Sequence, residues 1–227
     1  MPSTITFRQD KHIGVSAIDQ NHVLSAYGVF DITNFSVDVP NGDVDFVITP
    51  TLMSKLQSVF RSDESVEFKI SDDKVMIDTS TRHYDELLDA PTTRGSSLAK
   101  QVVYDKYGWR LSSVNPDAAY KISKSVLRYH FQPTDYITFE YGVSLNLRVI
   151  DNNYKSVYTE PLETMEVDLK SKGSVTVRYS NIDGVFRCVD DNFWLLLAHK
   201  APLTVTISEP GNFDVSYILA PIIERKD

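Results

Sequence analysis

The sequence predicts an α+β fold made of one repeated unit, an amphipathic helix followed by a β-hairpin. The evidence is a switch between two periods: apolar residues recur at helical spacing, then alternate with polar residues as they do in half-buried strands. The complete unit occurs three times and a hairpin alone precedes it, over the ranges Thr49–Ile77, Asn115–Ile150, Ser180–Ile207 and Thr4–Ile18. Because a repeated supersecondary unit defines an architecture, these copies are expected to build similar domains.

Length and composition agree with two domains. The chain has 227 residues, of which 42% are hydrophobic, and a domain takes about 100–200 residues. The stretch Tyr84–Lys100 lacks sustained periodicity and is expected to be an exposed connector. We therefore expect an N-terminal domain over residues 1–90, a connector over 91–101 and a C-terminal domain over 102–227.

The sequence favours an intracellular protein that does not enter a membrane. Its start lacks a basic segment followed by an apolar run, and no apolar run approaches the length of about 20 residues that spans a bilayer. The single cysteine, Cys188, fits a reducing compartment. The expected location is cytoplasmic or nucleoid-associated, or nuclear in a eukaryote.

The first helix has clear start signals. Thr49 can cap it and Pro50 takes the first helical position. Lys55 and Arg61 occupy the polar surface. Apolar residues at helical spacing form the other face, namely Leu52, Met53, Leu56, Val59 and Phe60. Alternating strands over 66–70 and 75–77 then form the hairpin.

The second helix is expected to start at Asn115 as its cap, with Pro116 next. Lys121, Lys124 and Arg128 follow at i, i+3 and i+7, which would place three cations on one helical face. The hairpin after it is expected over Tyr136–Tyr141 and Ser144–Ile150.

The third helix is expected to be short, with Ser180 as its cap and Arg187 on its polar side. Its hairpin follows over Asn192–Ala198 and Leu203–Ile207. Further strands are expected over Tyr27–Phe35, Val44–Ile48 and, as a pair, within Val157–Val177, and the stretch Val102–Leu111 is expected to begin the second half.

Three stretches resemble the sliding clamps of the proliferating cell nuclear antigen type. They are Ile18-Asp-Gln-Asn-His-Val23, Ile48-Thr-Pro-Thr-Leu-Met-Ser-Lys-Leu56 and Tyr217-Ile-Leu-Ala-Pro-Ile-Ile-Glu224. The resemblance covers nearly the whole chain. It implies two clamp domains per protomer and a head-to-tail ring, usually a homotrimer, with antiparallel sheets outside and helices lining a channel for duplex DNA.

The implied function is that of a processivity factor that encircles DNA, without sequence specificity, and tethers DNA polymerase and other replication or repair proteins. A clamp loader is a further expected partner. Basic residues on the channel helices would contact phosphates, which position a protein without specifying sequence. The resemblance supplies Lys55, Lys121 and Lys124, and the helical pattern adds Arg61, Arg128 and Arg187.

The resemblance also implies a groove for short partner peptides. Apolar walls beside free backbone groups can hold an extended segment with aromatic anchors. The connector around Leu87 and Leu88 is expected to form a flexible wall. The other groove positions are Ile18, His22, Val23, Pro202, Ile218, Ala220 and Pro221.

The chain departs from the family at its start. The resemblance begins at the first hairpin, so the family's N-terminal strand and helix have no counterpart and three channel helices per protomer are expected. This departure suggests a divergent clamp of viral or archaeal type and leaves the stoichiometry of the ring open.

An enzyme is not expected, because the sequence contains no phosphate-binding loop, dinucleotide turn, zinc-protease helix or serine elbow. We also expect no cofactor and no metal site. Asp72-Asp73 and Asp190-Asp191 are interpreted as turn residues, since Asp hydrogen-bonds its local backbone there. The alternatives left open are a clamp-fold factor in transcription or checkpoint signalling, and a β-rich viral structural or assembly protein.

Overall fold

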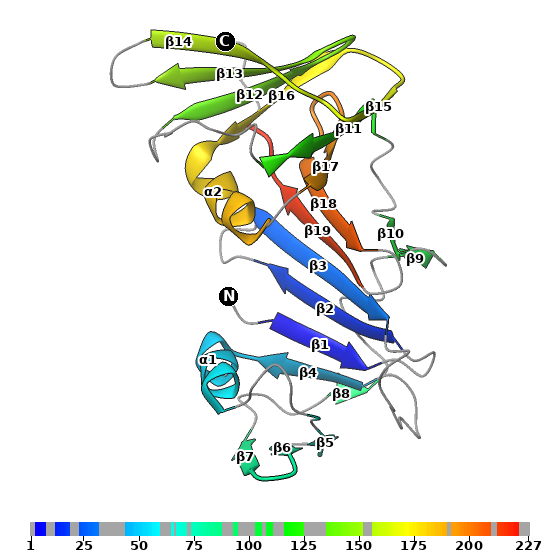
Figure 1. Ribbon diagram of the computed structural model, residues 1–227, viewed down its shortest axis with the longest axis vertical. Coiled ribbons are helices and arrows are strands. Elements are labelled where there is room, and N and C mark those ends of the chain that lie inside the picture. The colour runs from blue at the N-terminus through cyan, green and yellow to red at the C-terminus, as the bar shows by residue number, and fades with distance from the viewer. Residues whose placement is uncertain are drawn as a thin grey trace.

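The protein is built mainly from antiparallel sheets, with helices along one side (Figure 1). The computed structural model describes residues 3–7, 12–18, 23–31, 44–59, 65, 67–71, 74–87, 93–94, 103–105, 108–110, 116–124, 135–151, 156–189, 192–209 and 213–222. Within these ranges two helices are present, α1 (Pro50–Val59) and α2 (Tyr179–Cys188).

A long sheet of ten strands runs through the middle of the molecule in the order β15-β11-β17-β18-β19-β3-β2-β1-β4-β8. Its central junction is the antiparallel pair β19–β3, which joins the last described strand to the first half of the chain. The strands, in sheet order, are Glu166–Leu169, Ala118–Ser123, Asn192–Leu197, Leu203–Glu209, Phe213–Leu219, Leu24–Asp31, His12–Ile18, Ser3–Phe7, Val44–Ile48 and Thr93–Arg94.

Three smaller sheets complete the described fold. A four-stranded sheet has the order β14 (Ser156–Leu162), β13 (Leu145–Asp151), β12 (Tyr136–Tyr141) and β16 (Gly173–Arg178). A three-stranded sheet consists of β5 (Glu67–Ile70), β6 (Lys74–Asp78) and β7 (His83–Leu87). The hairpin β9 (Val103–Asp105) and β10 (Gly108–Arg110) is the third.

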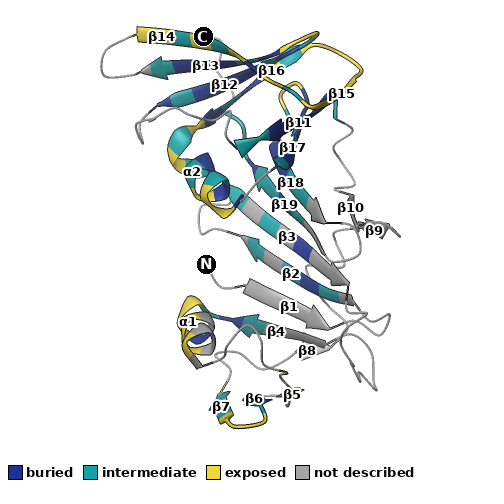
Figure 2. Cartoon of the chain, in the orientation of Figure 1, coloured by how far each residue is buried: buried dark blue, intermediate teal, exposed yellow. Residues whose placement is uncertain are grey.

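The main apolar core lies between the four-stranded sheet, α2 and the adjoining strands of the long sheet (Figure 2). Tyr120 and Phe193 come from the long sheet, Phe139 from the four-stranded sheet and Ile182 from α2, and all four are fully buried. Burying one such side chain stabilises a fold by about 1.5–3 kcal/mol. The core therefore fixes α2 against both sheets.

Several predicted elements are confirmed. The α1 helix begins at Pro50, and the Thr49 hydroxyl oxygen accepts a hydrogen bond from the backbone N–H of Leu52 at 3.2 Å. This bond satisfies one of the free donors at the helix start. The four predicted hairpins are the antiparallel pairs β1–β2, β5–β6, β12–β13 and β17–β18.

The helix predicted from Asn115 is wrong over residues 118–123, which form β11. Tyr120 and Ile122 are fully buried and Lys121 lies between them, so the segment follows the period of a strand. A run of six residues is short enough to fit either a helical or an alternating pattern of apolar residues. Pairing with β15 and β17 selects the strand. Asn115 and Arg128 lie outside the described residues.

Two other predictions need correction. Ser180 is not the cap of the third helix: Arg178 is the N-cap, without a side-chain bond, and the Asp135 carbonyl accepts the Tyr179 N–H at 3.0 Å. The proposed connector Tyr84–Lys100 begins within strand β7, because residues 83–87 pair with β6. The stretch Val157–Val177 contains parts of three strands, β14, β15 and β16, where two were expected.

In the described part of the chain, neither helix combines the length and the apolar character needed to span a membrane.

Candidate functional site

The two described helices lie on the same side of the long sheet, on the left in Figure 1. The first predicted cation on this side is Lys55, on α1. Its Nζ donates to both carboxylate oxygens of Glu86 on β7, at 2.6 and 2.9 Å. The Lys55 ammonium, and after it the Tyr84 hydroxyl, hold the pKa of Glu86 below its usual range. Lys55 therefore reaches solvent with its charge balanced by a neighbour.

Arg187 is the most exposed of the predicted cations that the structure describes, with 77% of its side chain accessible. It projects from α2 on the side away from Ile182 and Val185, which are buried in the core. Its guanidinium lies 2.6 Å from the carboxylate of Asp183, one helical turn earlier. The Arg187 side of this ion pair is therefore accessible from solvent.

Asp183 is held ionised by two neighbours. The Tyr179 hydroxyl donates to its carboxylate at 2.6 Å, and Arg187 contacts its second oxygen. The Tyr179 hydrogen bond, followed by Arg187, lowers the pKa of Asp183. Burial, with the Asp183 carboxylate second, raises the pKa of Tyr179 to about 12. The row Tyr179-Asp183-Arg187 is therefore preorganised along one face of α2.

A further cation, Arg178, was missed by the sequence reading. It immediately precedes α2, and its guanidinium carbon lies 5.7 Å from the centre of the Tyr136 ring on β12. Stacking of this kind holds a guanidinium in place while leaving its edges available. The sequence predicts strands up to Val177 and a helix from Ser180, so Arg178 is assigned to neither.

Lys121 does not belong to a helical stripe, and it lies on the other face of the long sheet. Tyr120 and Ile122 face the core that contains α2, so the strand alternation places Lys121 on the opposite face. There it contacts Glu166 at 2.6 Å and lies 5.9 Å from the centre of the Trp194 ring. The structure does not bring Lys121 together with Arg187.

Of the three remaining predicted cations, Lys124 alone lies within the described residues. Lys124 is half-buried and follows β11 directly. Arg61 and Arg128 lie outside the described residues.

Several positions predicted for the peptide groove lie next to one another in the structure. The Ala220 N–H donates to the Val23 carbonyl at 2.8 Å, which continues the β19–β3 pairing beyond the strand ends. Leu203 pairs with Leu219, so Pro202 precedes β18 beside this same point. Ile218, Ala220 and Pro221 are all half-buried. The structure therefore brings together the groove positions from β19, from β18 and from the segment before β3.

The wall predicted from the connector is not part of this set. Leu87 ends strand β7, in the three-stranded sheet at the far end of the molecule from β18 and β19 (Figure 1). The segment that contacts both β19 and β3 is β10 (Gly108–Arg110), on the side of the long sheet opposite to α2. Ile18 lies at the end of β2, while His22 and Leu88 are outside the described residues.

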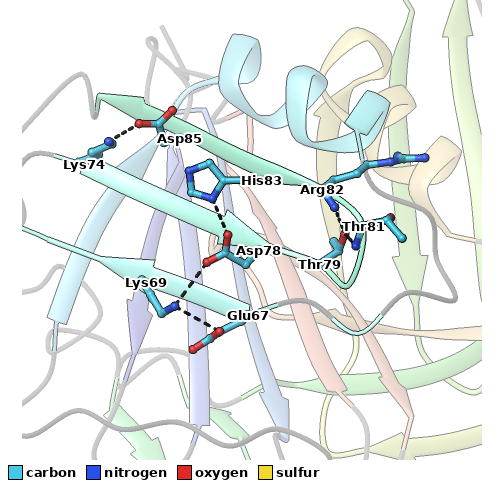
Figure 3. A network of polar contacts seen from close by, with 9 residues as sticks. All are labelled: Glu67, Lys69, Lys74, Asp78, Thr79, Thr81, Arg82, His83 and Asp85. Atoms are coloured by element: carbon cyan, nitrogen blue, oxygen red, sulfur yellow. Dashed lines mark hydrogen bonds and ion pairs between the residues drawn. The ribbon is translucent and has the colours of Figure 1, made fainter.

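A polar network covers the outer face of the three-stranded sheet (Figure 3). Lys69 lies 3.3 Å from Glu67 and 3.4 Å from Asp78, and the His83 Nδ1 lies 2.5 Å from Asp78. His83, followed by Lys69, holds the pKa of Asp78 below its usual range. The other side chains drawn in the network are Lys74, Thr79, Thr81, Arg82 and Asp85.

No group of three or more His, Cys, Asp or Glu residues within the described ranges is arranged to hold a metal ion. Asp72-Asp73 and Asp190-Asp191 lie outside those ranges.

Comparison with solved structures defines the fold. A PCNA from A. fulgidus, solved with the C-terminal region of FEN-1 bound, superposes with a TM-score of 0.76, and the match covers 99% of this chain and 91% of that one at 14% identity. The chain has the PCNA clamp fold. The PCNA of Entamoeba histolytica gives a TM-score of 0.73 over 98% of this chain and 89% of its own, at 16% identity.

A third clamp structure agrees with these two. The PCNA2-PCNA3 complex of Sulfolobus tokodaii matches with a TM-score of 0.69 over 97% of this chain and 89% of that one, at 14% identity. No family model and no curated protein sequence matches the chain. The clamp fold predicted from the sequence is therefore confirmed at the level of three-dimensional structure.

Proposed function

We propose that this chain is a DNA sliding clamp, a processivity factor that encircles duplex DNA and tethers DNA polymerase and other replication or repair proteins. The observation that carries the proposal is the clamp fold over nearly the whole chain, shared with three solved clamps. A protein with this role is a scaffold and performs no catalysis. It acts inside the cell, where the DNA is.

The proposed DNA channel is the side of the molecule that bears α1 and α2. Of the cations predicted from the sequence, Arg187 and Lys55 lie on this side, and both are paired with carboxylates. A phosphate must compete with Asp183 or Glu86 for each cation, so each contact contributes little net affinity. Weak, sequence-independent contacts are what a sliding ring requires. Lys121 is left out of this surface because it projects from the opposite face of the sheet.

The assembly we propose is a homo-oligomeric ring, with three protomers as the expected number. Each protomer comprises two clamp domains, with residues 91–101 as the connector. One solved neighbour is a complex of two different PCNA chains, which supports association between clamp-fold subunits. Head-to-tail contacts close into a ring when the rotation between neighbours completes a turn.

Encirclement is tested by comparing how the protein is retained on circular DNA and on the same DNA after it has been cut. The purified chain is incubated with nicked circular duplex DNA, with a clamp loader where one is needed, and the complexes are isolated by gel filtration. Cutting the circle with a restriction enzyme should release the protein, because a ring can slide off a free end. Equal retention on circular and linear DNA would contradict the clamp proposal and favour the structural or assembly alternative.

The channel surface is tested by three variants measured for salt-dependent DNA binding. Arg187→Ala should weaken binding and reduce the salt slope by about 1 for each phosphate that the protein no longer neutralises. Asp183→Asn frees Arg187 from its partner and should strengthen binding. Lys121→Ala, on the opposite face, is the matched control and should change neither quantity. An effect of Lys121→Ala as large as that of Arg187→Ala would overturn the assignment of the channel side.

We also propose that partner peptides bind around the β19–β3 junction and the segment that follows it. One neighbouring clamp was solved with the C-terminal region of FEN-1, which supports a peptide of that kind as the probe. Pro221→Gly and His22→Ala should each weaken its binding by fluorescence polarisation. Leu87→Ala, in the distant three-stranded sheet, should leave the affinity unchanged. Unchanged affinity in the first two variants would count against this site.

A further inference from the structure

Strand β15 lies at one end of the long sheet, and within the described residues only β11 pairs with it (Figure 1). The Lys170 N–H donates to the Asp117 carbonyl at 2.8 Å, in register with the β11–β15 pairs. Because backbone groups alternate in direction along a strand, those of Val167 and Leu169 point away from β11. All four residues of β15 are exposed. The strand therefore presents backbone donors and acceptors at its outer edge.

Apolar side chains line the core-facing side of this edge. Val167 pairs with Tyr120, which is fully buried in the main core, and Leu169 lies two residues further along the same face. These two side chains are nevertheless 47% and 40% exposed. Val143, which is 99% exposed, lies beside them, because the Tyr120 hydroxyl donates to the carbonyl of the adjacent Gly142 at 2.6 Å. Val143, Val167 and Leu169 together form an apolar strip along the outer edge.

The other face of β15 carries two carboxylates, Glu166 and Asp168. On the edge that is already paired, β11 sets Lys121 opposite Glu166, and the two side chains meet at 2.6 Å. The same strand sets Tyr120 opposite Val167. Strand β11 thus shows which side chains complement β15, namely an apolar residue on the core-facing side and a cation on the other.

We propose that the outer edge of β15 is a docking site for an extended segment of a partner protein, in which two apolar residues flank a lysine or an arginine. The segment adds to the sheet as an antiparallel strand, as β11 does on the other edge. Its apolar residues lie opposite Val167 and Leu169 and cover the apolar strip, and its cation lies opposite Asp168. A cation opposite Glu166 would have to share that carboxylate with Lys121.

This contact is separate from the surfaces proposed above. Strands β11, β17 and β18 stand between β15 and β19 in the long sheet, so the segment does not touch the proposed peptide site. It needs neither DNA nor a closed ring. The docking site and the sliding clamp can therefore be tested independently, and either can fail without the other.

The antiparallel arrangement fixes which backbone groups of the segment are used. Its two apolar residues each exchange a pair of hydrogen bonds with Val167 or Leu169, while the N–H of the central cation points away from β15. A parallel strand would show the opposite pattern, because the N–H of its central residue would point towards β15. The direction of the added strand can therefore be measured by blocking single N–H groups.

Fluorescence polarisation with synthetic peptides tests the chemistry of the segment. The probe is a labelled Gly-Ser-Thr-Val-Lys-Val-Thr-Ser-Gly peptide, and its match has glutamate in place of the lysine. The unaltered chain should bind the lysine peptide at least about tenfold more tightly. Asp168→Lys should reverse this preference, and the milder Asp168→Asn should bring the two affinities close together. Glu67→Lys makes the same charge change in the distant three-stranded sheet and should leave the preference unchanged.

Methylation of backbone nitrogens in the lysine peptide tests the strand geometry. Methyl groups on both valine nitrogens remove the donors that face β15 and should weaken binding at least about tenfold. A methyl group on the lysine backbone nitrogen should change the affinity by less than about twofold, because that N–H faces away. The reverse order of these two effects would overturn the antiparallel arrangement.

Three results would overturn the docking site itself. They are no saturable binding of the lysine peptide at concentrations on the order of 1 mM, equal affinity for the two peptides, and an unchanged preference in Asp168→Lys. Circular dichroism checks that each variant is folded. Analytical ultracentrifugation without peptide tests a second copy as the occupant. A change of oligomeric mass in Asp168→Lys but not in Glu67→Lys would show that copies of the chain pair through β15, and the partner segment would be wrong.

Discussion

The four-stranded sheet of the second half and the three-stranded sheet of the first half are stabilised in different ways. The former packs its inner face, including Phe139 and Leu147, into the main apolar core. The latter buries Val75 and Ile77 beneath it and carries a layer of exposed ion pairs on its other face (Figure 3). Apolar burial contributes far more per residue than exposed ion pairs. The second half should therefore supply most of the resistance to unfolding.

The largest expected effect comes from the centre of that core. Phe139→Ala should lower the free energy of unfolding by about 3–5 kcal/mol, because a fully buried aromatic ring is replaced by a cavity. The measurement is urea denaturation followed by circular dichroism. Lys69→Ala, in the charged layer of the first half, is the matched control. A loss in Phe139→Ala no larger than in the control would remove the contrast between the two sheets.

An intermediate effect is expected at Asp117, which ties together segments far apart in sequence. Its carboxylate accepts hydrogen bonds from the Tyr141 hydroxyl at 2.8 Å and the His199 N–H at 2.9 Å. Its carbonyl accepts the N–H groups of Lys170 and Ser171. Asp117→Ala removes these side-chain bonds and should cost about 2 kcal/mol. Thermal unfolding measures the loss, and an unchanged melting temperature would show that these bonds are replaced by water at no cost.

The same residue predicts a pH dependence. The His199 N–H, followed by the Tyr141 hydroxyl, holds the pKa of Asp117 below its ordinary value. A lowered pKa in the folded state gives stability that is present above the unfolded pKa of about 3.9 and is lost as the pH falls through the folded value. Urea titrations from pH 6 to pH 2 should therefore show a smaller acid-induced loss in Asp117→Asn than in the unaltered chain. An equal acid-induced loss of stability in the two chains would contradict a role for the lowered pKa of Asp117.

The smallest effect is expected in the charged layer itself. Lys69 contacts Glu67 and Asp78, but Lys69 and Glu67 are exposed and Asp78 is only half-buried. Lys69→Ala should change the free energy of unfolding by less than about 1 kcal/mol, since exposed ion pairs are screened and entropically costly. Denaturation at low and high salt provides the measurement. A large loss that disappears in high salt would show that the layer acts as a cooperative network.

Much of the fold could be predicted because several segments carry one unambiguous signal. Thr49-Pro50 marks the start of α1, and Tyr136–Tyr141 alternates without interruption. Residues 118–123 are predicted as helix because Ala119 and Ile122 lie at helical spacing. Ala118, Tyr120 and Ile122 fit the period of a strand equally well, and only the neighbours β15 and β17 decide between the two. The pairing of β19 with β3 depends on contacts between distant segments, which the local periodicity could not supply.

The cations of the candidate site could be predicted from the sequence, but their ion-pair partners could not. The exposed cation on α2, Arg187, lies where the helical pattern placed it. Its partner Asp183 and the partner of Lys55, Glu86, were not anticipated. The first is a neighbour one turn away, whereas the second comes from a strand 31 residues further along the chain. Leu87 was assigned to the groove because its segment read as a flexible connector, and its pairing within β7 places it elsewhere.

The pairing of β3 with β19 has a consequence for how the protein is made. Leu24 pairs with Leu219 and Phe30 with Phe213, so these partners are separated by 195 (219 minus 24) and 183 (213 minus 30) residues. β2 precedes β3 and covers one of its edges, but a ribosome must synthesise the whole stretch up to β19 before the other edge of β3 is paired. Contacts of such long sequence separation form slowly. Until the last strand emerges, the edge of β3 is exposed to other nascent chains, and a chaperone that covers strand edges should raise the yield of folded protein.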